Sequence, residues 1–97
     1  MNANLAELMG IHLGDGCISI TKKYFMYYLG GDLTEERDYH KLWVKRLFDQ
    51  EIMIPLTGKK VKYKSYPSMG IYGFYIFKKI IVDFFLSQGI KSGQKID

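Results

Sequence analysis

Hydrophobic residues recur at helical spacing along the first fifteen positions of the chain. Between residues 5 and 13, leucine, methionine and isoleucine lie three and four positions apart, which is typical of a helix that packs one face on a core. Asn4 is suited to cap the start, because its side-chain oxygen accepts an orphan amide while Glu7 reaches back. Glycines on both sides of Asp15 favour a stop, since glycine adopts the left-handed backbone that ends helices. The pattern predicts a helix of about three turns with a carboxylate at its C-terminal end.

Small residues occupy every fourth position of this helix, because Ala6, Gly10 and Gly14 fall on one face. A glycine inside a helix costs about 1 kcal/mol relative to alanine, so two of them indicate a compensating gain. Close packing against a second helix is one such gain, because a face without bulky side chains lets two backbones approach. The predicted contact surface consists of Ala6, Gly10, Leu13 and Gly14. The alternative is a buried helix that packs on its own sheet.

Asp15 is poorly placed for a purely structural role. A carboxylate at a helix C-terminus faces the negative end of the helix dipole. A nearby cation reverses this effect, and Mg²⁺ prefers hard oxygen ligands, such as one or two carboxylates together with substrate phosphates. One aspartate makes a weak metal site, whereas two copies of the helix would bring two aspartates together. The alternative is that Asp15 belongs to an ordinary Gly-Asp-Gly turn.

The chain after Asp15 alternates between β-prone and helical patterns. Alternating hydrophobicity with glycine and proline punctuation predicts four strands, over residues 17–22, 24–29, 60–65 and 69–77. In the first strand, Ile18 and Ile20 are predicted to face inward.

Two further helices are predicted from apolar residues at helical spacing. The first is capped by Asp32 or Thr34 and has an apolar face made of Tyr39, Leu42, Trp43, Leu47 and Phe48. A loop over residues 52–60 is predicted to follow, because Pro55 and Gly58 interrupt the pattern. The last helix covers residues 77–87.

The element order α-β-β-α-β-β-α predicts an α+β fold, with an antiparallel sheet covered by helices on one face. The other face would be bare and rich in lysines, hydroxyls and tyrosines. Such a face suits the DNA major groove, where lysines contact phosphates or guanine edges and hydroxyls adapt to several partners. The predicted DNA-binding residues are Ser19, Thr21, Lys22, Lys23, Tyr28, Lys60, Lys62, Lys64, Tyr66, Ser68 and Tyr72. The alternative is an ordinary solvated sheet face.

Composition narrows the class of protein. Ninety-seven residues allow one domain, predicted to span 1–97, and 47% hydrophobic residues favour a folded chain. The single cysteine, Cys17, fits a reducing compartment, so an intracellular location is expected, either cytoplasmic or organellar. No apolar run reaches the roughly 20 residues of a membrane span. Residues 1–58 carry 6 Lys/Arg and 8 Asp/Glu (−2), whereas residues 59–97 carry 8 Lys and 2 Asp (+6). The C-terminal part is therefore the candidate for binding a polyanion.

Residues Leu8–Gly16 (LMGIHLGDG) resemble the nine-residue motif of LAGLIDADG homing endonucleases, sharing its first Leu, its first Gly and the final Asp-Gly. The step from Gly16 into a strand is similar to that family too. Gly31-Asp32-Leu33, followed by Glu36, Asp38 and Tyr39, resembles the start of the second helix in archaeal and intein members. The order of elements agrees over essentially the whole chain.

The resemblance implies a saddle-shaped αββαββα fold and, since one motif is present, a homodimer that binds a pseudo-palindromic double-stranded DNA site. It implies that Asp15 binds Mg²⁺ or Mn²⁺ with the carbonyl of Gly14 as co-ligand. It also implies that two ions cleave the phosphodiester bond. A basic residue near the end of the third helix assists in the family, and the resemblance implies Lys95, or else Lys91, as the counterpart here. A polar residue at the start of the second helix orients water; Thr34, Asp32 and Glu36 remain open alternatives.

Three functions are therefore weighed. The first is a metal-dependent, sequence-specific homing endonuclease. The second keeps the fold and the dimer without cleavage, as a DNA-binding regulator or an RNA maturase. The third is a monomeric domain whose partner is a protein. His12 departs from the family pattern, and it is expected in the core or at the interface, or as a pH-sensitive group.

Overall fold

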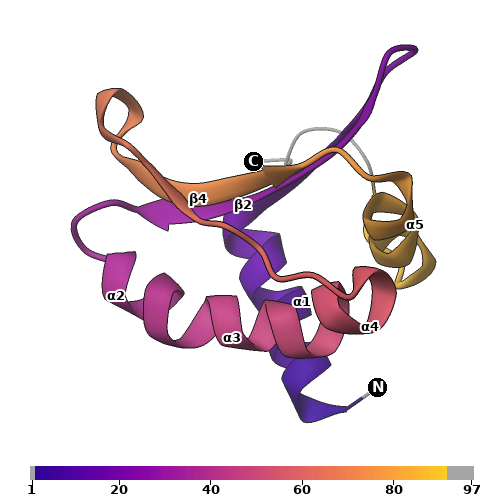
Figure 1. Cartoon of the computed structure of the whole chain (residues 1–97), viewed down its shortest axis with the longest axis horizontal. Coiled ribbons are helices and arrows are strands. Elements are labelled where there is room, and N and C mark those ends of the chain that lie inside the picture. Colours follow the sequence, from indigo (N-terminus) through magenta and orange to yellow (C-terminus); the bar gives the residue numbers. More distant parts are fainter. Residues whose placement is uncertain (1, 92–97) are drawn as a thin grey trace.

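The computed structural model describes residues 2–91 as one layer of sheet above a layer of helices (Figure 1). Helix α1 (Ala3–Asp15) leads into strands β1 (Gly16–Ile20) and β2 (Phe25–Asp32). A long helical segment follows, made of α2 (Arg37–Tyr39), α3 (Lys45–Phe48) and α4 (Ile54–Thr57), joined by π-helical turns at His40–Val44 and Asp49–Met53. The chain continues with β3 (Lys64–Tyr66), a 3-10 turn (Pro67–Met69), β4 (Ile71–Ile76) and α5 (Lys79–Ser87).

The four strands form one antiparallel sheet in the order β1-β2-β4-β3. The helices lie on one side of this sheet, and α1 stands upright with its C-terminal end at the sheet (Figure 1). The predicted α+β class and the order αββαββα are therefore confirmed. None of the helices formed by residues 2–91 has the length and hydrophobicity needed to cross a membrane.

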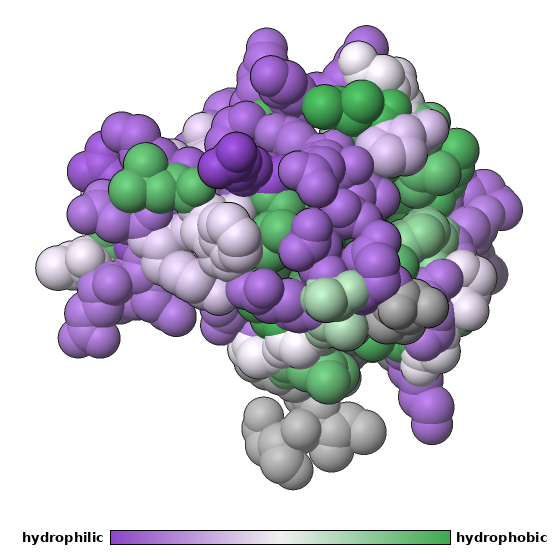
Figure 2. Space-filling view, turned by 90° about the horizontal axis from the view of Figure 1, so that it is seen from below, coloured by the Kyte–Doolittle hydropathy of each residue, from purple (hydrophilic) through white to green (hydrophobic). Residues whose placement is uncertain are grey.

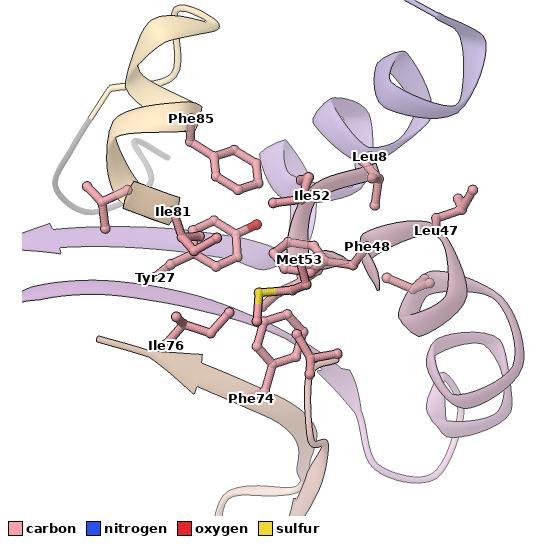
Figure 3. Packing of buried hydrophobic residues seen from close by; sticks show 14 of the residues in the cluster. Leu8, Tyr27, Leu47, Phe48, Ile52, Met53, Phe74, Ile76, Ile81 and Phe85 are labelled. Carbon is pink, nitrogen blue, oxygen red and sulfur yellow. The ribbon is translucent and has the colours of Figure 1, made fainter. Parts of the chain in front are cut away.

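Tyr27 lies at the centre of the hydrophobic core and is fully buried (Figure 3). Its ring stacks on Phe85 at 4.3 Å and on Phe48 at 5.5 Å, so one strand residue joins α5 to the long helix. The Tyr27 hydroxyl and Nδ1 of His12 form a hydrogen bond of 3.0 Å. His12 is thus a buried core residue of α1, stacked also on Phe85.

The two ends of α1 differ from the prediction. Asn2, not Asn4, is the N-cap, because its Oδ1 accepts a hydrogen bond of 2.7 Å from the amide of Leu5. At the other end, the prediction that a glycine in the left-handed conformation stops the helix is wrong, because Gly16 has φ −104° and is the first residue of β1. Glycine is needed at this position for a different reason: a Cβ there would collide with the His12 ring.

The loop predicted over residues 52–60 is wrong, because the long helix continues to Thr57. Ile52 and Met53 are buried, and their packing outweighs the helix-breaking tendency of Pro55. Gly58, with φ 75°, provides the stop.

Trp43 and Leu42 do not belong to the core, although their spacing predicted it. Their side chains are 38% and 69% exposed, whereas His40 and Val44 are buried. The π-helical turn at His40–Val44 adds a residue to the turn, which changes the rotational phase and points different side chains inward. Tyr39 is exposed as well, so the inner face begins one residue later than predicted.

Three strands are shorter than predicted, because β1 ends at Ile20, β3 covers Lys64–Tyr66 and β4 covers Ile71–Ile76. Ile20 is 40% exposed, because the β1–β2 hairpin projects beyond the helical layer (Figure 1). Of the predicted 60–65 strand, only Lys64 and Ser65 pair with the sheet, and β3 extends to Tyr66. Val61 is buried and is held instead by the helix, through a 2.7 Å hydrogen bond from its amide to Oδ1 of Asp49.

Candidate functional site

One face of the sheet is turned away from the core. Side chains alternate along β2 and β4, and the buried residues Leu29, Phe74 and Ile76 all point to the helices. The positions between them therefore lie on the open face. Tyr28 and Tyr75 pair across β2 and β4 there, with ring centroids 4.9 Å apart.

A groove runs over this open face. It is a hollow of about 480 Å³, lined by Tyr24, Met26, Lys62, Lys64, Tyr66, Tyr75 and Phe77. The ring centroids of Tyr66 and Tyr75 are 5.8 Å apart in an edge-on arrangement, so the floor of the groove is aromatic. The cations of one wall are Lys64 of β3 and Lys62 of the segment before it. Aromatic rings beside lysines are the arrangement that nucleic-acid surfaces use for stacking and for phosphate contacts.

Several of the predicted DNA-binding residues meet on this face. Tyr28, Lys62, Lys64 and Tyr66 do so, and Ser19 shares the side of β1 that pairs with Met26. Four further aromatic or apolar residues were missed: Tyr24, Met26, Tyr75 and Phe77. Their alternation with Phe74 and Ile76 would have identified Tyr75 and Phe77.

Other predicted DNA-binding residues lie elsewhere. Tyr72 is on the helix-facing side, where it stacks on Tyr63 at 4.9 Å, because the two-residue period places it with buried Phe74. Lys60 is exposed between the long helix and β3, bordering Lys41 as well as the sheet lysines.

The hairpin tip and the β3–β4 turn complete the set. Thr21, Lys22 and Lys23 are exposed at the tip, where Oγ1 of Thr21 accepts the amides of Lys23 and Tyr24 and so shapes the turn. Ser68 is exposed in the 3-10 turn before β4.

Asp15 lies where α1 meets the sheet, and its side chain is 29% exposed. Its Oδ2 is 3.6 Å from Nε2 of His40, a fully buried residue of the long helix. On the other side of the ring, Nδ1 of His40 and the hydroxyl of Tyr63 form a hydrogen bond of 2.8 Å. Asp15, His40 and Tyr63 therefore form a continuous row from the end of α1 to the segment before β3. Sequence reasoning missed His40 and Tyr63.

Gly31 makes this row possible. A Cβ at Gly31 would lie 2.7 Å from Nε2 of His40 and 2.9 Å from Oε1 of Glu36. Only the bare backbone of β2 can therefore pass over the imidazole. The signal available in the sequence was the Gly30-Gly31 pair directly after the predicted 24–29 strand, because a glycine in a strand often marks a close approach of another group.

The three residues considered for orienting water have structural contacts. Oδ2 of Asp32 accepts the amides of Thr34 and Glu35, and Oε1 of Glu36 accepts the amide of Asp32 at 2.8 Å. This reciprocal pattern resembles a capping box and fixes the turn into α2. The prediction that Asp32 or Thr34 caps the helix is wrong, because the N-cap of α2 is Glu36; Asp32 bonds the turn that precedes α2, and Thr34 is exposed.

Burial and charge shift several pKa values around Asp15. Burial lowers the pKa of His40, and the carboxylates of Asp15 and Glu36 oppose this shift. Burial, then the neighbouring Tyr75 and the charge of Asp15, raise the pKa of Tyr28 to about 12. Burial, Glu7, Asp15 and Glu36 raise the pKa of Tyr39 above its usual value. His40 is therefore a neutral imidazole at neutral pH, and both tyrosines keep their protons.

The donor set of one chain supplies only part of a metal site. Among residues 2–91, no group of three or more His, Cys, Asp and Glu side chains is arranged to hold a metal ion. Asp15 and the carbonyl of Gly14 provide oxygen donors of the kind Mg²⁺ prefers, and one or two carboxylates with phosphate oxygens suffice for this ion. The two donors thus fit Mg²⁺ in kind, but they form only part of a site. Lys91 is exposed beyond α5, and Lys95 lies outside the described residues.

The outer side of α1 is uncovered. Ala6, Gly10, Leu13 and Gly14 are all exposed, and Leu13 is 65% exposed. A Cβ at Gly10 or Gly14 would meet nothing within 4 Å, so the fold of one chain does not need glycine there. On the helix side, the surface is mostly hydrophilic with separate hydrophobic patches (Figure 2).

Titration of His40 provides a test of this site. Because the pKa of His40 is lowered on folding, the unfolded chain binds the proton more tightly. The stability that neutral His40 contributes is present above the unfolded pKa of about 6.5 and is lost as the pH falls through the folded pKa. We expect an NMR titration of the His40 ring to give a pKa below that value. We also expect the free energy of unfolding to decrease less on acidification in His40→Gln than in the unmodified protein. His12 is present in both proteins, so it does not cause the difference. A raised pKa would contradict this account of the site.

Comparisons of the chain with protein-family models, with curated proteins and with solved structures give no match.

Proposed function

We propose that this chain is a metal-dependent double-stranded DNA endonuclease that works as a homodimer, as the resemblance to LAGLIDADG homing endonucleases implies. The observation that carries the proposal is the placement of α1. This helix stands upright against the sheet, exposes a side lined with small residues, and ends in a carboxylate at the sheet. One element thus combines a surface for a second copy with a candidate metal ligand.

The open sheet face is the proposed DNA surface. A twisted antiparallel sheet can lie in the major groove. Lys62 and Lys64 would contact phosphates from the wall of the groove, and the hydroxyls of Tyr28, Tyr66 and Tyr75 would meet base edges or sugars. The net charge of +6 over residues 59–97 supports DNA binding on this face, because the DNA backbone is negatively charged.

The glycines of α1 support the homodimer. Each glycine within the helix costs about 1 kcal/mol relative to alanine, and neither Gly10 nor Gly14 contacts anything that would exclude a methyl group. The contacts within one chain therefore do not explain why glycine occupies these two helix positions. Two α1 helices packed through these positions would account for it and would bring the two Asp15 carboxylates to one place.

In the dimer, Asp15 of each chain, with the carbonyl of Gly14, would hold the divalent ions. Bound Mg²⁺ or Mn²⁺ lowers the pKa of water and stabilises the leaving oxygen in phosphodiester hydrolysis. The chain's own contribution is to bind the duplex on the sheet and to keep the carboxylates at the symmetry axis, where the two sheets meet. The second candidate is a nucleic-acid-binding protein of this fold without cleavage, a regulator or an RNA maturase, which the small donor set within residues 2–91 favours.

Asp15→Asn tests the chemistry. The amide keeps the shape of the side chain and loses the negative charge that a metal requires. We expect loss of cleavage of a selected DNA target in Mg²⁺, with binding retained in a mobility-shift assay. Asp83→Asn, an exposed change on α5, is the matched control and should cleave as the unmodified protein does. Equal cleavage by Asp15→Asn would remove the assignment, and absence of cleavage by the unmodified protein would favour the second candidate.

Lys64→Ala tests the DNA surface. Each subunit would lose one phosphate contact, so the slope of log affinity against log salt should fall in magnitude by about 2 per dimer. Lys41→Ala removes an exposed lysine of the helix side and serves as the matched control. Affinity measured at several salt concentrations by fluorescence anisotropy gives the slopes. Equal slopes for the two variants would place DNA elsewhere.

Gly10→Ala and Gly10→Leu test the dimer. In an isolated chain, Gly10→Ala should stabilise α1 by up to about 1 kcal/mol, because its Cβ has open space. In a dimer packed on α1, the added methyl groups would push the helices apart, and Gly10→Leu should give monomers. Sedimentation velocity reports the mass, and Ser87→Leu on α5 is the control. A monomeric unmodified protein would support the third function, a monomeric domain with a protein partner. A dimer unaffected by Gly10→Leu would show that the second copy does not pack on this side of α1.

A further inference from the structure

His40 has a buried polar atom without a hydrogen-bond partner. Within residues 2–91, Nε2 of His40 is the only buried side-chain nitrogen or oxygen atom that has no hydrogen-bond partner. An unsatisfied buried donor or acceptor destabilises a fold, so such an atom calls for an explanation. The atom does not face apolar side chains; it faces Oδ2 of Asp15 at 3.6 Å, which is just beyond hydrogen-bond length.

The hydrogen bond with Tyr63 bears on which nitrogen of His40 carries the proton. If Nδ1 carried it, the lone pair of Nε2 would face the Asp15 carboxylate, and two acceptors would oppose each other. If Nε2 carries it, the Tyr63 hydroxyl donates to Nδ1 at 2.8 Å and Nε2–H faces the carboxylate. The second arrangement satisfies Nδ1 and aims the only imidazole N–H at Asp15.

The surroundings hold the imidazole in this orientation. The backbone of Gly31 passes over Nε2, and the ring of Tyr63 is itself stacked on Tyr72 at 4.9 Å. Neither side of the His40 ring can therefore turn freely. Asp15 is the less enclosed member of the row, with 29% of its side chain exposed.

We infer that His40 is a positioning residue, which directs the Asp15 carboxylate through Nε2–H and is itself oriented by the Tyr63 hydroxyl. The inference rests on the proposed function, because Asp15 is the metal ligand there. A small rotation of the carboxylate shortens 3.6 Å to hydrogen-bond length and fixes one orientation for binding the ion. Hydrogen bonds to a ligating carboxylate are worth about 10- to 100-fold in metal affinity or activity.

Three substitutions separate positioning from other roles. His40→Leu removes the donor at similar volume. His40→Gln places an amide N–H near the position of Nε2, and Tyr63→Phe removes only the hydroxyl. The readouts are the Mn²⁺ concentration for half-maximal DNA cleavage and Mn²⁺ binding to the protein, followed by electron paramagnetic resonance. Thermal unfolding and sedimentation confirm that each variant is folded and assembled.

We expect His40→Leu to need about 10- to 100-fold more Mn²⁺, His40→Gln to stay close to the unmodified protein, and Tyr63→Phe to lie between them. Unchanged metal dependence in a folded His40→Leu overturns the inference while the nuclease proposal stands. Loss in His40→Gln as large as in His40→Leu overturns it too, because that result makes the imidazole itself a ligand.

The tautomer can be measured on the unmodified protein without any activity. We expect the ¹⁵N shifts of the His40 ring to show a proton on Nε2 and none on Nδ1. A proton on Nδ1 overturns the inference. If the protein does not cleave DNA at all, this measurement and Mn²⁺ binding still decide the His40–Asp15 relation, so the failure of the function and the failure of the inference are distinguishable.

Discussion

The direct passage from α1 into β1 is the constraint on which the rest of the structure depends. No loop separates Asp15 from Gly16, so the end of the helix is fixed at the sheet. The hydrogen bond between His12 and Tyr27 anchors the same turn of α1 to the middle of β2. Gly16 is required because a side chain there would collide with the His12 ring. The carboxylate is therefore placed by core packing, and its position does not depend on a mobile loop.

The glycines of this chain divide by what they touch. Gly16 and Gly31 are required within one chain, because a Cβ would meet His12 in the first case and His40 with Glu36 in the second. Gly10 and Gly14 are not required in this way, since a Cβ added at either position would meet nothing within 4 Å. The first pair builds the surroundings of Asp15, and the second pair leaves the outer side of α1 flat. The fold and the proposed assembly thus make separate demands on the same residue type.

Polar residues inside the fold join its elements. His12 links α1 to the sheet, and His40 and Tyr63 link the long helix to the segment before β3. Asp49 accepts the amide of Val61 and pairs with Lys45 at 2.8 Å, so it holds the same segment at its other end. These contacts connect the helical layer to β2 and to the segment before β3. They explain why a site assembled from residues far apart in the sequence can be rigid.

The sequence by itself determined the element order, the α+β class and the two faces of the sheet, because hydrophobic periodicity is local information and the apolar side must be buried. Only the tertiary structure decided the phase of the long helix. A π-helical turn buried His40 in place of Trp43, and packing of Ile52 carried the helix through Pro55. It also decided which residues surround Asp15. His40 and Tyr63 come from distant positions, and no local pattern encodes a contact that forms only when helix, strand and glycine backbone close on one another.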